Sequence, residues 1–344
     1  MNNSTISKTI SPNPLDEYLI AYFDLLGYKD FFKAQPNQIP IFLNSINDVI
    51  QKVKSNIEIP HKSQIISNNI HFDILMKVFS DNILLCLKTE STNMEIAKVL
   101  TFISIIAEIQ RKFTTGYGLF LRGGITKGSL SFNADFVFGQ GLIDAVELEE
   151  KAIYPRIIFS TEFLDYLSGL QDKNQFPVPN AKKYFENWQK SLVISSPDGS
   201  RILNYLGKIK VDNPIPENIF NSLLDILKKT YPKDYELLSY GVYNQKETIQ
   251  LHRKKLVDNL TKYGKYDDIP TDNKKNAETR EKILKKYLWV LSYHNYICDN
   301  YNYPQHIIYG LCNCDFRFLT TTITVVENNA AEAPHEAGRN WIDS

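Results

Sequence analysis

Two short apolar runs separated by three polar residues constrain the fold of this chain most strongly. Ile74–Phe79 and Ile83–Leu87 have the length and composition of β-strands. Between them lie Ser80, Asp81 and Asn82, which are residue types favoured in tight turns. The pattern predicts a β-hairpin that carries a carboxylate at its tip.

Strands and helices are expected to alternate around this hairpin. The apolar run Leu19–Phe23 is strand-like and ends at Asp24, whereas Ile39–Val53 repeats apolar residues at the spacing of one helix face. Ser55–Asn69 is expected to be a loop, and Thr92–Phe113 a long helix. Further strands are expected at Leu119–Ile125, from Gly128 to Phe136, at Ile157–Phe159, Leu192–Ser195 and Ile202–Leu206, with a helix at Gly141–Lys151 and a helix cap at Ser160. This order predicts an α+β fold, in which a ferredoxin-like or palm-like sheet is flanked by helices.

The character of the sequence changes after Pro214. Three long, Lys-rich helical stretches follow, at Ile219–Tyr231, Tyr235–Leu260 and Ala277–Tyr301. We therefore expect a first domain over residues 1–212 and a C-terminal helical extension over residues 213–327. Residues 328–344 lack periodicity and are expected to form a mobile tail.

Composition excludes several classes of protein. The 39 Lys and Arg residues balance the 39 Asp and Glu residues, which removes the usual electrostatic argument for a nucleic-acid partner. No apolar run reaches the roughly 18–20 residues of a membrane span, and the polar N-terminus lacks the apolar core of a signal peptide. Cys86, Cys298, Cys312 and Cys314 are too few for a disulfide framework, and the last two lack the second pair of a zinc site. We expect a soluble cytoplasmic protein.

Asp24 and Asp81 are distinguished by their positions. In a ferredoxin-like sheet the first strand and the hairpin are neighbours, so both carboxylates should meet at one end of the sheet. Two close carboxylates repel each other, and a bridging divalent cation would relieve that repulsion. Such pairs hold the two metals of in-line phosphoryl transfer. The alternative is that each Asp only ends its strand or caps the next helix.

Four motifs in order resemble the signatures of class III nucleotidyl cyclases. They are Tyr22-Phe23-Asp24-Leu25-Leu26-Gly27-Tyr28, Met76–Asp81 with Ser80 at a position where the family usually has Gly, Leu121–Gly128, and Phe138–Leu142. The chain most closely resembles the bacterial pyrimidine cyclases of the Pycsar anti-phage system, through Arg122-Gly123-Gly124, the stretch from Gly139 to Ile157, and the late helix with Tyr287-Leu288-Trp289 and Tyr293-His294-Asn295.

The resemblance implies a reaction and the residues that carry it. Asp24, Asp81 and the carbonyl of Leu25 would hold two Mg²⁺ or Mn²⁺ ions. The ribose 3′-hydroxyl of UTP or CTP would attack the α-phosphorus, and pyrophosphate would leave. The product would be a cyclic nucleotide, a second messenger in anti-phage defence that a separate effector protein reads. Gly27 and Lys77 would contact the substrate, although Lys77 fits a solvent-facing strand position equally well.

The resemblance also implies a homodimer with its sites between the subunits. Leu119, Leu121, Phe136 and Phe138 are apolar residues that would suit such a surface, and burial within one subunit would explain them as well.

One departure from the family pattern concerns the helix after Gly139. The family carries an Asn and an Arg there to stabilise the transition state, but this chain has Ile143 and Glu147. An acidic side chain cannot replace a guanidinium beside a reacting phosphate. We expect Arg156 to substitute, with Arg122 in reserve.

Two other interpretations stay open. The chain could be a catalytically inactive cyclase-like module that senses or binds a partner. It could instead be another palm-fold nucleotidyltransferase, against which the absence of a Gly-Gly-Asp/Glu-Glu-Phe hairpin counts.

Overall fold

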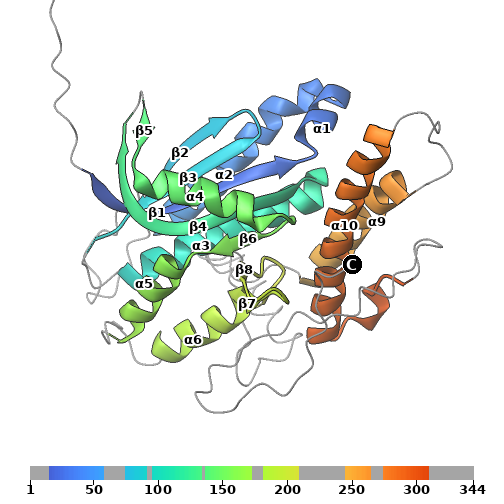
Figure 1. Cartoon of the computed structure of the whole chain (residues 1–344). Helices are drawn as coiled ribbons and strands as arrows, with labels where there is room; N and C mark the ends of the chain where they lie inside the picture. The colour runs from blue at the N-terminus through green and yellow to red at the C-terminus, as the bar shows by residue number, and fades with distance from the viewer. Residues whose placement is uncertain are drawn as a thin grey trace, which may run out of the picture.

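The computed structural model describes residues 15–57, 74–90, 95–133, 136–172, 181–208, 245–264 and 274–309. Its strands form one sheet in the order β2-β3-β1-β4-β6-β8-β7, and β5 pairs with β4 (Figure 1). The strands are β1 (Asp16–Leu26), β2 (Ile74–Phe79), β3 (Asn82–Lys88), β4 (Phe120–Phe132), β5 (Val137–Phe138), β6 (Ile157–Phe159), β7 (Val193–Ser195) and β8 (Arg201–Leu203). The helices of the first part are α1 (Tyr28–Ala34), α2 (Ile39–Ile57), α3 (Glu95–Lys112), α4 (Gln140–Ala152), α5 (Thr161–Asp172) and α6 (Ala181–Leu192).

Strand β1 is an interior strand of the sheet. It pairs antiparallel with β3 on one side and with β4 on the other, and β2 completes the hairpin with β3. Four antiparallel strands in the order β2-β3-β1-β4, with helices in both connections, are the ferredoxin-like arrangement, so the predicted α+β fold is confirmed. The predicted bounds of β2 and β6 also match those of the structure.

Alternate residues of β1 serve two hydrophobic clusters on opposite faces of the sheet. Leu19 and Phe23 belong to the main core, which also contains buried residues of α2 and α3. Tyr18 and Ile20 belong to a smaller cluster on the other face, where Ala145 of α4 joins them. Figure 1 shows α4 lying across that face.

Glycines set the distance between α4 and the sheet. A Cβ atom on Gly124 would lie 2.3 Å from the Cβ of Leu148, and one on Gly128 would lie 2.8 Å from the Cα of Gly141. The helix can approach β4 this closely only because these side chains are absent. We had expected a strand break at Gly128, but β4 runs on without one to Phe132, because Gly128 serves the helix contact instead of a turn.

Two further helix ends can be compared with the sequence predictions. Helix α2 continues to Ile57, beyond the expected loop start at Ser55. Ser160 caps α5 as predicted, because its Oγ accepts a hydrogen bond from the backbone N–H of Phe163 at 3.1 Å.

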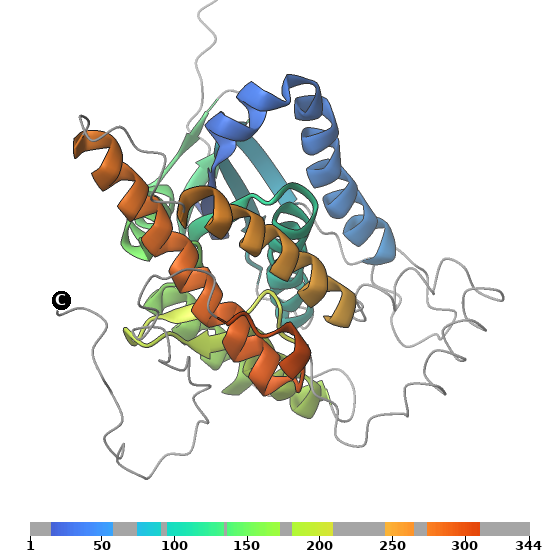
Figure 2. The same cartoon turned by 90° about the vertical axis from the view of Figure 1, so that its right-hand side faces the viewer.

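Two C-terminal helices, α9 (Gln245–Gly264) and α10 (Lys274–Asn300), pack against each other (Figure 2). Their apolar residues, such as Leu256 and Val290, belong to the same main core as the sheet. Buried His252 and His294 stack at 5.0 Å between ring centroids, and burial lowers the pKa of His294 to about 4. The helical extension therefore shares one core with the first part of the chain.

Some predictions lie outside the described residues. These are most of the loop at 55–69, the domain boundary at 212–213, the helix at 219–231, the first part of the helix at 235–260, the tail at 328–344, and Cys312 with Cys314. In the part of the chain that is described, no helix has both the length and the apolar character required to cross a membrane.

Candidate active site

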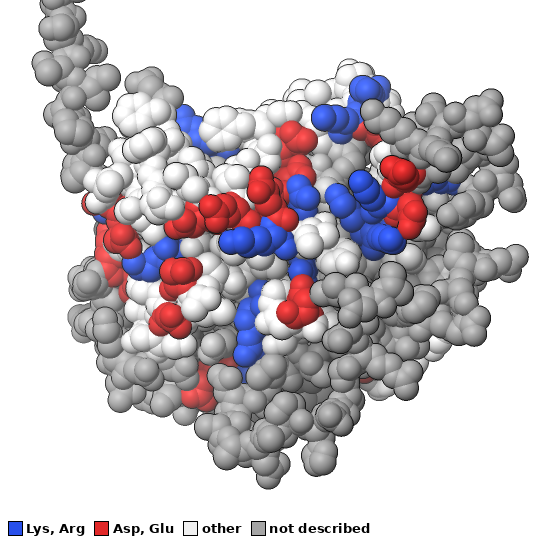
Figure 3. Space-filling model, in the orientation of Figure 1, with Lys and Arg blue, Asp and Glu red and all other residues white. Residues whose placement is uncertain are grey.

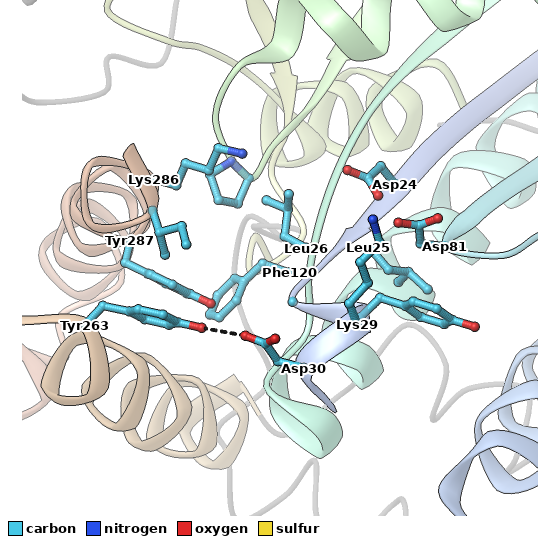
Figure 4. A pocket seen from close by; sticks show the side chains of 14 residues that line it. Asp24, Leu25, Leu26, Lys29, Asp30, Asp81, Phe120, Tyr263, Lys286 and Tyr287 are labelled. Carbon is cyan, nitrogen blue, oxygen red and sulfur yellow. Dashed lines mark hydrogen bonds between the residues drawn. The ribbon is translucent and has the colours of Figure 1, made fainter. Parts of the chain in front are cut away.

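A cavity of about 280 Å³ lies at the C-terminal end of β1. Six parts of the chain meet there: the turn from β1 into α1, the tip of the β2–β3 hairpin, the start of β4, the segment between α4 and β6, the end of α9 and the middle of α10 (Figure 4). The lining residues are Asp24, Leu25, Leu26, Gly27, Tyr28, Lys29, Asp30, Asp81, Phe120, Pro155, Tyr263, Ile283, Lys286 and Tyr287.

The sheet register brings the two predicted carboxylates together. Asp24 lies opposite Asn82 of β3, the residue that follows Asp81. The backbone N–H of Leu25 donates a 2.9 Å hydrogen bond to the carbonyl of Asp81, which ties the hairpin tip to the end of β1. Asp24 and Asp81 therefore line one cavity, as their positions in the sequence predicted.

Several charged groups lie close to Asp24. Burial raises the pKa of Asp24, and the neighbouring charge of Asp81 raises it further, while Arg122 and Lys286 act to lower it. The Nη2 atom of Arg122, directly opposite on β4, lies 3.2 Å from Oδ2 of Asp24 and also pairs with Glu149 of α4. One guanidinium is thus shared between two carboxylates.

These residues fit a divalent cation of the Mg²⁺ or Mn²⁺ type. Both side chains offer carboxylate oxygens, and the repulsion between them would be relieved by an ion between them. Among the described residues no group of three or more His, Cys, Asp and Glu side chains gathers to form a complete metal cage. A pair of carboxylates suits Mg²⁺, which keeps several waters and takes further ligands from substrate phosphates. That Leu25 contributes its carbonyl stays a prediction.

We expected Arg156 to supply the missing transition-state charge, and the structure places it outside the cavity of its own subunit. Its side chain is buried, with 3% of the residue exposed, and it does not line the cavity. The guanidinium donates hydrogen bonds to the Ser196 Oγ at 2.7 Å and to Asp198, and its Nε donates to the carbonyl of Ala152. Burial acts to raise the pKa of Asp198, but hydrogen bonds from Arg156 and Ser200 outweigh it and hold this pKa at about 2. Arg156 thus joins the β7–β8 turn to the end of α4.

Glu149 is the acidic residue of α4 closest to Arg156 in the sequence after Glu150, but it pairs with Arg122, and Arg156 pairs with Asp198. Asp198 is distant in the sequence and becomes a neighbour only through the pairing of β6 with β8.

The two predicted substrate contacts lie in different places. Gly27 lines the cavity, and its φ of 86° is in the left-handed region, which glycine adopts without strain. Lys77 does not line the cavity; its Nζ lies 5.8 Å from the centroid of the Phe132 ring, on the sheet face that α4 partly covers. Within one subunit, Lys77 and the carboxylate pair are not brought together.

The two departures from the family pattern lie on the outer face of α4. Ile143 is 51% exposed, and Glu147 is exposed and pairs with Lys151 at 3.4 Å. Neither residue lines the cavity of its own subunit.

Lys286 is one of the cavity residues that were not predicted from the sequence. It is half-buried on α10, and Figure 4 shows its amine extending toward the side where Asp24 lies. The sequence did carry a signal, because Ile283, Lys286, Tyr287 and Val290 follow the i, i+3, i+4, i+7 spacing of one helix face. A Lys-rich helix most often presents a solvated face, and Lys282 and Lys285 are exposed accordingly, whereas Lys286 is half-buried.

No model of a known protein family matches the chain, and no curated protein matches its sequence. Solved structures similar to it include the adenylyl cyclase CyaB from P. aeruginosa, at a TM-score of 0.31 and 16% identity; the alignment covers 45% of this chain and 82% of CyaB. They also include a bacterial light-regulated adenylyl cyclase, at a TM-score of 0.31 and 14% identity, with 57% of this chain and 54% of that protein covered. The chain thus spans about half the length of the light-regulated enzyme it matches.

Proposed function

We propose that this protein is a nucleotidyl cyclase that converts a nucleoside triphosphate to its 3′,5′-cyclic monophosphate and pyrophosphate. The observation that carries the proposal is the meeting of Asp24 and Asp81 in one cavity, at the end of β1, an interior strand of a ferredoxin-like sheet. Paired carboxylates in this position suit chemistry at a phosphate, where negative charge must be offset by cations.

The cavity residues would have separate roles in the reaction. Asp24 and Asp81 would hold Mg²⁺ or Mn²⁺, which when bound offsets the charge of the triphosphate and lowers the pKa of the ribose 3′-hydroxyl. Gly27 lines the cavity and has no side chain, so phosphate oxygens could approach the backbone there. The 3′-oxygen forms a bond to the α-phosphorus, the bond to pyrophosphate breaks, and the hydroxyl proton passes to solvent.

The substrate we propose is a pyrimidine nucleotide, UTP or CTP, and the product is a signal in anti-phage defence that a separate effector protein reads. This part of the proposal is supported by the resemblance of the Arg122-Gly123-Gly124 motif and of the stretch from Gly139 to Ile157 to the Pycsar cyclases.

We further propose that the active form is a homodimer. Three exposed apolar residues lie beside the smaller hydrophobic cluster: Phe136 just before β5, Phe138 on β5 and Ile143 on α4. Figure 3 shows mostly uncharged atoms where β5 lies in Figure 1, and a row of acidic side chains where α4 lies. Leu119 and Leu121, which we had considered for the same surface, are buried in the main core and do not belong to it.

The second candidate function is a catalytically inactive module that binds a nucleotide or a partner. Exposed Ile143 and Glu147 favour it, because α4 then offers no Asn or Arg to a site in either subunit. The same experiment separates the two candidates.

The test is to incubate the purified protein with ATP, GTP, CTP and UTP in the presence of Mn²⁺ and to identify cyclic products by mass. We expect a cyclic pyrimidine nucleotide, and Asp24→Asn or Asp81→Asn should lower its formation about a thousandfold, a loss of roughly 4 kcal/mol of transition-state stabilisation. Asn keeps the shape of Asp but removes the charge that binds the metal.

Asp16→Asn is the matched control. Asp16 begins the same strand that carries Asp24 but pairs with exposed Lys88 at 2.6 Å, away from the cavity. This variant should keep full activity. Equal activity of Asp24→Asn and the wild type would overturn the proposal, and nucleotide binding without any product would favour the inactive module.

A further inference from the structure

The C-terminal helix α10 places a lysine in the cavity of the two carboxylates. Lys286 lines this cavity together with its helix neighbours Ile283 and Tyr287, which pack against the main core. Because α10 is anchored by this packing, the position of the Lys286 backbone is fixed relative to β1. The extension thereby forms one wall of the cavity.

The electrostatic surroundings of Lys286 come from the site itself. Burial lowers the pKa of Lys286 and the charge of Arg122 lowers it further, whereas the charges of Asp24 and Glu149 raise it. Within the described part of the chain, no hydrogen bond or ion pair engages the Lys286 amine. Neighbouring Lys285, by contrast, is exposed and pairs with Glu281 at 3.0 Å.

Two arginines expected near the site are engaged by other residues. Arg122 is shared between Asp24 and Glu149, and Arg156 is held by Asp198. Lys29, at the start of α1, is the other lysine of the cavity wall; it is exposed, and Figure 4 shows its amine directed toward the carboxylates. A phosphate chain held near Asp24 would therefore have lysines on two sides.

We propose that Lys286 binds the polyphosphate chain of the nucleotide, so that the C-terminal extension supplies a substrate contact to the active site of its own subunit. An ammonium group is a compact charge with three N–H donors, which suits the oxygens of successive phosphates. The inference rests on the proposed function for the identity of the ligand. It differs from a purely structural role, in which Lys286 would only offset the charge of Asp24.

The test is direct binding of tripolyphosphate with Mg²⁺, measured by isothermal titration calorimetry on the full chain. Lys286→Gln should raise the Kd about tenfold, because a charge-assisted hydrogen bond is lost. Lys286→Arg should restore most of the affinity, and Lys285→Gln, one residue away on the exposed face, should bind as the wild type does. If the protein turns over a nucleotide, Lys286→Gln should raise KM about tenfold with a smaller change in kcat.

The outcomes separate this inference from the proposed function. Lys286-dependent binding of tripolyphosphate without any cyclic product would support the inference while the proposed function fails. Wild-type affinity of Lys286→Gln would overturn the inference, even in a protein that makes cyclic nucleotides. A Lys286→Gln protein with unchanged Kd and reduced thermal stability would assign the lysine a structural role and overturn the inference as well.

Discussion

Two arginines show how the role of a single residue depends on contacts that sequence spacing does not define. Arg122 and Arg156 both lie near the end of α4, and both were candidates for the cation that Glu147 cannot provide. In the structure, Arg122 forms ion pairs with Asp24 and Glu149 at the site, whereas Arg156 forms an ion pair with Asp198 on the β7–β8 turn. The difference arises because β4 carries Arg122 opposite Asp24, whereas Arg156 precedes β6, on the side of the sheet that continues into β8.

Arg156→Ala should therefore lower stability and not specifically turnover. It leaves Asp198 without its main partner and removes a buried side chain, and breaking such a pair costs about 3 kcal/mol of the free energy of unfolding. Chemical denaturation measures this loss. The guanidinium also lies 5.6 Å from the centroid of the Trp289 ring, so tryptophan fluorescence should change with the variant. A fully stable Arg156→Ala protein without activity would return the residue to the catalytic role that we first expected.

At the level of elements, strong local patterns were predictable and long-range contacts were not. The hairpin bounds followed from apolar runs and turn residues, and the meeting of Asp24 with Asp81 followed from the sheet order. The approach of α10 to the cavity could not be predicted from the sequence. The spacing of Ile283, Lys286 and Tyr287 shows which face of the helix is buried, but it does not show which part of the chain that face packs against. The length of β4 was missed for a related reason, since Gly128 has its partner in α4.

The contact between α4 and β4 can be tested through its glycines. Gly124→Ala should destabilise the protein by about 1–3 kcal/mol, because the new Cβ would lie 2.3 Å from the Cβ of Leu148 and the helix would have to move. Gly169→Ala is the matched control: nothing lies within 4 Å of a Cβ at this position in α5, and Ala favours a helix by about 1 kcal/mol over Gly. Urea unfolding of both variants measures the difference. Equal effects of the two substitutions would mean that the close approach of α4 does not occur.

At the level of the whole molecule, the two faces of the sheet are covered unequally. The main core joins the sheet to α2 and α3 and extends to α9 and α10. On the opposite face, the smaller cluster lies under α4, and residues at its edge such as Tyr22, Phe132 and Leu142 are only partly buried. A sheet face of this kind is usually covered by a further layer, which a second copy of the chain would provide.

Phe138→Ser tests whether the exposed edge of this smaller cluster joins two subunits. Phe138 is 71% exposed, and burial of such a ring at the centre of an interface contributes about 2 kcal/mol or more, so its loss should raise the dimer dissociation constant by at least tenfold. Tyr309→Ser is the control, since Tyr309 is also an exposed aromatic residue but follows the 3₁₀ helix at Pro304–His306, which packs against α9 and α10. Sedimentation velocity over a range of protein concentrations measures both variants.

If the site needs both subunits, the activity of Phe138→Ser should rise with protein concentration more steeply than that of the wild type, because each active site forms only in the dimer. A wild-type protein that remains monomeric at every concentration while fully active would exclude this arrangement, and the partly covered sheet face would then need another explanation.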